Sequence, residues 1–167
     1  GALVGAEGSA ATPEPVAVEE IEFPMSSGQK GLWYAYRRDP SSTPYNVFLP
    51  ARVRSPLDVG ALARTFEIVV ERHPALRTTF TDEGGELRQR VQPSLRPEIL
   101  VTDVAGTDVE VVRERMVADA ARPFDLEQGP LLRMSAYRLA DDDWLVLATT
   151  HHIVVDFWSL ILLLEEV

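Results

Sequence analysis

Cysteine is absent from this chain of 167 residues. Disulfide bonds, thiol nucleophiles and thiolate metal sites are therefore excluded. Histidine is scarce as well, with only three residues, so a site with three imidazole ligands is not expected and no metal is assigned. The longest apolar run, Leu160 to Leu164, is far too short to cross a bilayer, and no membrane partner is expected.

Positive charge is also in short supply. Lysine and arginine total 16 against 26 acidic residues, which gives a formal net charge of -10. Such a chain gains nothing from counterion release on DNA or RNA, so nucleic acid is not an expected partner. The N-terminus lacks the basic region of a signal peptide, which favours a cytoplasmic protein. Hydrophobic residues make up 46% of the chain, and its length suits one globular domain.

The composition divides the chain into two parts. Residues 1–20 are rich in Gly, Ala, Pro, Val and Glu and have no apolar period, which predicts a flexible interdomain linker. Order is expected to begin near Ile21 and to continue through residues 21–167. The last segment, Trp158 to Val167, has a helical pattern that is still apolar at its end and has no C-terminal cap. We therefore expect a domain that is truncated within a larger protein.

Hydrophobic periodicity predicts alternating helices and strands. Helices are expected from Ser26 or Ser27 through Tyr36, from Pro56–Asp58 to His73–Pro74, and over Asp108 to Ala121. The expected strands are Asn46 to Arg54, Leu76 to Phe80, Leu87 to Val91, Glu98 to Val101, Leu131 to Leu139 and Trp144 to Thr150. The last of these is nearly all apolar, which is typical of a central strand buried on both faces. Hairpins mixed with helices indicate an α+β fold, with helices packed on a mostly antiparallel sheet.

Two adjacent histidines, His151 and His152, directly follow this apolar strand. Neighbouring residues of a strand point to opposite faces, so the two side chains cannot play the same role. One is expected to face a cleft and the other to pack inward. Asp156 lies near the start of the next predicted helix, where a carboxylate is favoured by the helix dipole. It could cap that helix or pair with a buried arginine.

Spacing alone leaves the chemistry of the histidine pair open. Zinc is disfavoured, because His73 is the only further histidine. A serine triad is disfavoured, because no Gly-x-Ser-x-Gly occurs. A general base is plausible, since histidine titrates near neutral pH. The alternative is a pair of core histidines with their hydrogen bonds satisfied, and it carries similar weight.

A resemblance to a known family changes this balance. The segment from His151 to Ser159 resembles the core motif of nonribosomal peptide synthetase condensation domains, which has two histidines, three variable residues, Asp, Gly and often Trp-Ser. Three further segments resemble family motifs in the same order: Met25 to Trp33, Glu71 to Phe80 and Pro123 to Arg133. Four matches in order make chance improbable, and together they span residues 23–167.

The resemblance implies a fold and an activity. The family has two chloramphenicol-acetyltransferase-like lobes that meet at an active-site tunnel, and this chain resembles the N-terminal lobe alone. The domain would be an acyltransferase that joins an acyl thioester to an amine. Donor and acceptor carrier proteins would present both substrates on phosphopantetheine, and the domain itself would need no cofactor. Without the missing C-terminal lobe the isolated fragment is expected to be inactive.

The resemblance also assigns residue roles. His152 is similar to the catalytic histidine, which orients the acceptor nitrogen and takes its proton. His151 resembles a structural residue, Asp156 holds the motif together, and Arg77 is its expected salt-bridge partner. Phe157, Trp158 and Ser159 are candidates for the lining of the substrate tunnel. Phe157 departs from the family pattern, which has Gly at that position.

Other residues and activities keep simpler interpretations. His73 is expected to pack at a helix end, and Trp33 and Trp158 to be core aromatics. Ester formation on the same scaffold and an epimerisation member of the superfamily stay as alternatives to amide formation. A non-catalytic lobe that docks carrier proteins is the alternative from a different class. The heterocyclisation branch is disfavoured, because it has aspartates in place of the paired histidines.

Overall fold

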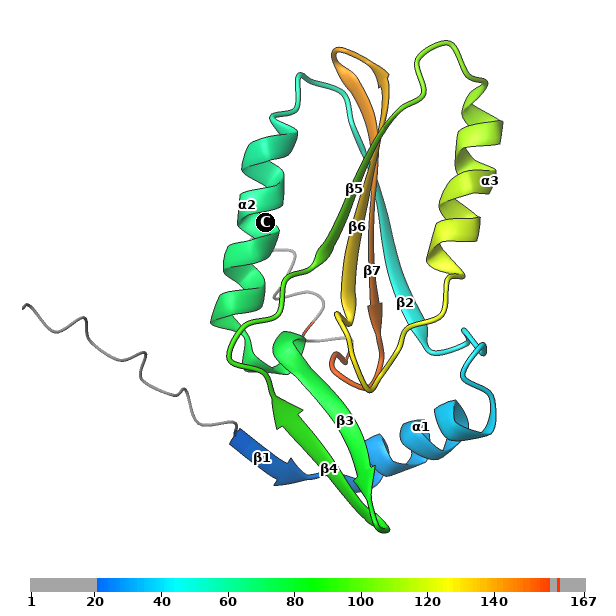
Figure 1. Ribbon diagram of the computed structural model, residues 1–167. Helices are drawn as coiled ribbons and strands as arrows, with labels where there is room; N and C mark the ends of the chain where they lie inside the picture. The colour runs from blue at the N-terminus through cyan, green and yellow to red at the C-terminus, as the bar shows by residue number, and fades with distance from the viewer. Residues whose placement is uncertain (1–20, 157–158, 160–167) are drawn as a thin grey trace, which may run out of the picture.

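A computed structural model describes residues 21–156 and residue 159 (Figure 1). This part of the chain contains three α-helices, one 3-10 helix and seven strands. In chain order they are β1 (Ile21–Pro24), α1 (Ser27–Arg38), β2 (Asn46–Val53), α2 (Val59–Arg72), η1 (Pro74–Arg77), β3 (Thr78–Glu83), β4 (Glu86–Val91), β5 (Glu98–Asp103), α3 (Val109–Ala120), β6 (Leu132–Ala140) and β7 (Asp143–His151). The linker predicted for residues 1–20 and the helix predicted from Trp158 lie outside the described residues.

The larger sheet has the strand order β2-β7-β6-β5. Strand β7 pairs antiparallel with β2 and with β6, whereas β5 and β6 are parallel. The apolar run Trp144 to Thr150 is therefore a central strand, as predicted. Its position brings His151 opposite Asn46 at one end of the sheet.

The smaller sheet has the order β1-β4-β3, with both pairings antiparallel. Gly84 and Gly85 form the β3–β4 turn with φ values of 66° and 94°, which residues with a Cβ rarely adopt. The predicted strand beginning at Leu76 is wrong at its start. Leu76 and Arg77 belong to η1, because Pro74 begins a short helical turn directly after α2.

The three helices predicted before His151 are confirmed, and each has a side-chain cap. Ser26 and Gln29 form a reciprocal capping box at the start of α1. Asp58 accepts from the backbone of Ala61 at the start of α2, and Asp108 from that of Glu110 at the start of α3. Helix α2 ends before His73–Pro74, as the sequence predicts.

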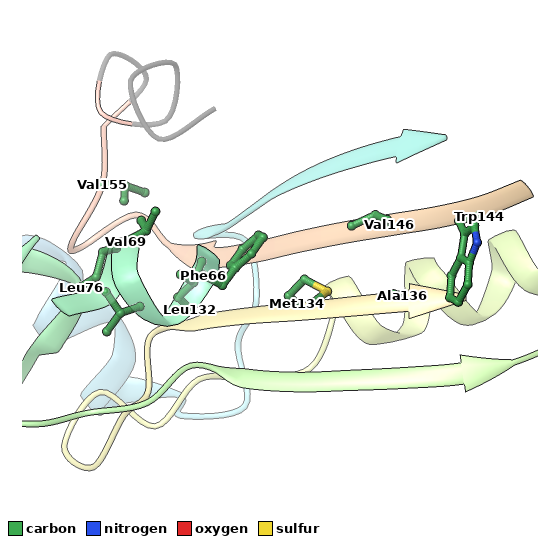
Figure 2. Packing of buried hydrophobic residues seen from close by; sticks show 10 residues of the cluster. Phe66, Val69, Leu76, Leu132, Met134, Ala136, Trp144, Val146 and Val155 are labelled. Carbon is green, nitrogen blue, oxygen red and sulfur yellow. The ribbon is translucent and has the colours of Figure 1, made fainter. Parts of the chain in front are cut away.

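Alternation along β7 explains how the larger sheet is covered on both faces. Trp144 and Val146 join a cluster with Phe66 and Val69 of α2 and Met134 of β6. Leu145 and Leu147 point the other way and pack with Val112 and Met116 of α3. Figure 1 shows the two helices on opposite sides of the sheet, and Figure 2 shows the cluster beneath α2. The result is a helix, sheet, helix arrangement of the α+β class.

A third cluster lies beside the smaller sheet and includes Ile153, which belongs to the histidine segment (residues 151–156). Trp33 of α1, Phe80 of β3 and Ile153 are buried together. The remaining buried members are Met25, Leu87, Phe124, Leu126 and Leu131. Trp33 is a core aromatic, as predicted. The cluster anchors the chain immediately after His152.

The cluster between α2 and the sheet should contribute strongly to stability. Met134 is fully buried within it. Replacing Met134 by Ala should lower the free energy of unfolding by about 2–5 kcal/mol, because a cavity replaces packed atoms. Val117→Ala on the solvent side of α3, where Val117 is 69% exposed, should change it by less than about 0.5 kcal/mol. Urea unfolding of both variants tests this, and similar losses for the two would contradict the packing.

Candidate active site

The four segments that carry the family resemblance come together around the end of β7. The backbone N–H of His151 donates to Leu131 O at 3.3 Å, and the N–H of Phe80 donates to Leu126 O at 2.9 Å. On the other side, the side chain of Gln29 donates to the carbonyl of Ile153. Segments far apart in the sequence therefore form one structural unit around the histidines.

His151 is the buried member of the pair, with 5% of its surface exposed. Its ring lies 6.3 Å from the rings of Tyr45 and Phe124, and the Phe124 contact is edge-on. Its Nδ1 accepts the backbone N–H of Ile153 at 3.1 Å. The neutral ring must therefore carry its proton on Nε2. Burial, and secondarily the charge of His152, lowers the pKa of His151 to about 4.

His152 is exposed and has the opposite hydrogen-bonding arrangement. Its backbone N–H donates to Tyr45 O at 2.9 Å, which fixes the main chain just beyond the sheet. Its Nδ1 lies 2.7 Å from the carbonyl oxygen of Val155. A carbonyl can only accept, so Nδ1 carries the proton and Nε2 keeps its lone pair. The arrangement thus leaves a basic nitrogen free to act on a bound molecule.

A hollow of about 370 Å³ lies beside His152, between the start of α1 and the histidine segment. It is open to solvent. Its lining residues are Ser26, Gly28, Gln29, Leu32, His152, Ile153, Val154, Val155, Asp156 and Ser159. A larger hollow of about 450 Å³ lies between α3 and β2, but its lining is mostly apolar and holds no histidine or carboxylate. The smaller hollow is therefore the candidate active site, because a histidine and a carboxylate line it.

Asp156 forms two hydrogen bonds with Ser159. Its Oδ1 accepts the backbone N–H and the hydroxyl of Ser159, both at 2.7 Å. These two hydrogen bonds hold the pKa of Asp156 below its ordinary value. The side chain is exposed, and the helix that it was expected to cap lies outside the described residues. Ser159 is therefore placed by Asp156 at the rim of the hollow.

The predicted ion pair between Arg77 and Asp156 is wrong. The Arg77 guanidinium donates to the carbonyls of Val70 at 3.2 Å and Gln92 at 2.5 Å, with a longer contact of 3.5 Å to Pro93. These carbonyls belong to the end of α2 and to the segment after β4. A carbonyl cage satisfies the guanidinium without a carboxylate, so Arg77 ties two backbone segments together away from the histidines.

Other site residues fall into three groups. His73 is the C-terminal cap residue of α2 and is half-buried, as expected for a helix-end residue. Phe157 and Trp158 lie outside the described residues. Tyr45 and Gln29 contact the histidine segment but were not singled out from the sequence. Gln29 belongs to the first matched motif, which was its only signal there.

Comparison with known proteins decides the family. The model of the condensation domain family matches residues 19–167. This chain belongs to the condensation domain family. One of the linear gramicidin synthase subunits of Brevibacillus parabrevis is 38% identical over 151 residues, which cover 88% of this chain and 3% of that protein. Phosphinothricin tripeptide synthetase PhsC of Streptomyces viridochromogenes is 37% identical over 147 residues, 86% of this chain and 14% of that protein.

Solved structures of a nonribosomal peptide synthetase and of a condensation domain have the same fold. A four-domain nonribosomal peptide synthetase bound to AMP and glycine matches with a TM-score of 0.81 and 26% identity, over 90% of this chain and 12% of that one. The starter condensation domain of rhizomide synthetase matches with a TM-score of 0.80 and 24% identity, over 87% of this chain and 36% of that one. The chain thus spans a small part of the length of these relatives. The predicted family and fold are confirmed. Among residues 21–156 and 159, no helix is long and apolar enough to cross a membrane.

The buried state of His151 should make stability depend on pH. Its pKa falls from an ordinary 6.5 in the unfolded chain to about 4 in the folded protein. Folding therefore favours the neutral ring, and the stabilisation is complete above pH 6.5 and lost as the pH falls to about 4. The loss corresponds to about 3 kcal/mol.

Urea unfolding of a condensation domain that carries this chain, measured from pH 7 to pH 4, tests this expectation. His151→Asn removes the titrating group and keeps an acceptor near the N–H of Ile153. The variant should lack this part of the pH dependence. An unchanged slope in the variant would show that another group causes the acid sensitivity.

Proposed function

We propose that this chain supplies the histidine-bearing lobe of a condensation domain that joins a carrier-bound acyl thioester to a carrier-bound amine. The observation that carries the proposal is the hydrogen bond from His152 Nδ1 to Val155 O at 2.7 Å. In the neutral ring this leaves the lone pair on Nε2, and His152 lines an open hollow. Family membership supports the reaction class, and the hydrogen bond at Nδ1 supports Nε2 as the atom that accepts the proton.

The proposed reaction is aminolysis of a thioester. The acceptor nitrogen attacks the thioester carbonyl carbon, a C–N bond forms, and the C–S bond breaks. Nε2 of His152 accepts the proton that the nitrogen loses, and the departing thiolate then takes up that proton. General-base action of this kind contributes about 10²–10⁴-fold. Fixing the acceptor nitrogen in place contributes through orientation.

The neighbouring residues hold His152 in position. His151 remains neutral and packs against Tyr45 and Phe124. Asp156 accepts the backbone N–H of Ser159. Arg77 is not among these neighbours, because it ties Val70 at the end of α2 to Gln92 after β4. Phe157, Trp158 and Ser159 are proposed to line the tunnel. Phe157 in place of Gly would either pack its ring into the core of the lobe, which leaves the acceptor side unchanged, or narrow the acceptor side.

The proposed partners are donor and acceptor carrier proteins, which bring the substrates on phosphopantetheine. Residues 1–20 would be a linker to a neighbouring domain. A second lobe would close the hollow of about 370 Å³ beside His152, which is open in this chain. An open hollow leaves the thioester exposed to water, so the isolated chain should not turn over. The net charge of -10 argues against nucleic acid as a partner, and the proposed site of action is the cytoplasm.

The proposal predicts a large effect of His152→Ala. In a full-length condensation domain that carries this chain, condensation should fall by about 10²–10⁴-fold, with little change in melting temperature because the side chain is exposed. Product formation between two loaded carrier proteins is the measurement. His73→Ala is the matched control, since it removes a histidine at the end of α2. Wild-type turnover by the His152 variant would reject the general-base assignment and favour a docking lobe.

A further inference from the structure

The side chain of Gln29 connects the start of α1 to the histidine segment, 124 positions away. Its Oε1 accepts the backbone N–H of Ser26 at 2.9 Å, and its own backbone N–H donates to the Ser26 hydroxyl at 3.2 Å. Its Nε2 donates to Oε1 of Gln89 at 3.1 Å and to the carbonyl of Ile153 at 3.5 Å. One amide thus serves a helix cap and a long-range contact at once.

The contact to Ile153 is supported from behind. Gln89 lies on β4 and donates its own Nε2 to the carbonyl of Pro24 at 3.1 Å. A chain of amide hydrogen bonds therefore runs from β1 through Gln89 and Gln29 to Ile153. The smaller sheet holds Gln29 in place, and Gln29 in turn meets the segment that comes after the larger sheet.

Ile153 is the residue that fixes the main chain next to His152. Its side chain is buried with Trp33 and Phe80, and its N–H donates to His151 Nδ1 at 3.1 Å. Gln29 binds its carbonyl. Both backbone polar groups of Ile153 are therefore engaged, and the backbone that carries the imidazole of His152 has little freedom to move.

The helix cap alone does not require glutamine. Glutamate at the same position of a capping box accepts the same N–H and is favoured by the helix dipole. Only an amide combines that acceptor with donors for Ile153 O and Gln89 Oε1. The long-range contacts with Ile153 and Gln89 therefore distinguish glutamine from glutamate at position 29.

We propose that Gln29 is a positioning residue for His152, acting through the carbonyl of Ile153. The inference rests on the proposed function of His152 as the base. Losing the amide donors would let the segment after His152 shift, and a displacement of about 1 Å at a reacting group can cost on the order of 10²-fold in rate.

Two substitutions in a full-length condensation domain separate positioning from stability. Gln29→Glu keeps the capping acceptor but removes both donors and adds a negative charge near His152. Gln29→Asn keeps the amide but is too short by one methylene to reach Ile153. Both should lower kcat by roughly 10- to 100-fold and leave KM for the carrier-bound substrates unchanged. Gln29→Glu should also raise the pH midpoint of kcat/KM, because a nearby carboxylate favours the protonated imidazole.

Gln92→Glu is the matched control, since Gln92 is also half-buried and its Nε2 donates to the Thr79 hydroxyl at 2.9 Å. It should keep the wild-type kcat and pH midpoint even if its melting temperature falls. Wild-type kcat in both Gln29 variants, or an equal loss in the Gln92 control, would overturn the positioning role. His152→Ala measured in parallel separates the two claims. If it retains activity, the proposed function fails; if it is inactive while the Gln29 variants are not, only the inference about Gln29 fails.

Discussion

The burial of β7 on all sides is the constraint on which the rest of the structure depends. Its edges are paired with β2 and β6, and its two faces are covered by α2 and α3. A strand held in this way cannot shift its register without exposing its apolar residues. Its end at His151 is therefore a fixed point, and the residues directly after it are held at a defined place relative to α1 and the smaller sheet (Figure 1).

The hydrogen bonds of the histidine segment turn that fixed point into a site. His151 accepts a hydrogen bond at Nδ1 from the backbone N–H of Ile153, whereas His152 donates one from Nδ1 to the carbonyl of Val155. Two identical side chains, adjacent in the sequence, thus have opposite tautomers. The buried ring stays neutral, while the exposed ring lines the hollow beside α1 and keeps a lone pair on Nε2 in its neutral form. Burial and backbone contacts, rather than residue type, divide the roles.

Sequence reasoning predicted the features that depend on local pattern. The cap at Ser26, the helix starts near Asp58 and Asp108 and the central strand follow from capping chemistry and apolar periodicity. The predicted ion pair of Arg77 with Asp156 was wrong. The N–H groups of a guanidinium can be hydrogen-bonded by carbonyls instead, and the positions of those carbonyls depend on tertiary packing. The contact of Gln29 with Ile153 was missed for the same reason, since it joins segments that meet only in the folded chain.

The tautomers of the two histidines test the account most directly. Nitrogen-15 NMR of a histidine-labelled condensation domain that carries this chain distinguishes protonated from unprotonated ring nitrogens at neutral pH. The hydrogen bonds predict that His151 has its proton on Nε2 and that neutral His152 has its proton on Nδ1. The signals of the two rings would be assigned from the spectra of His151→Asn and His152→Ala, since each variant lacks one ring. A neutral His152 ring protonated on Nε2 would contradict the account, because Nε2 would then have no lone pair with which to accept a proton.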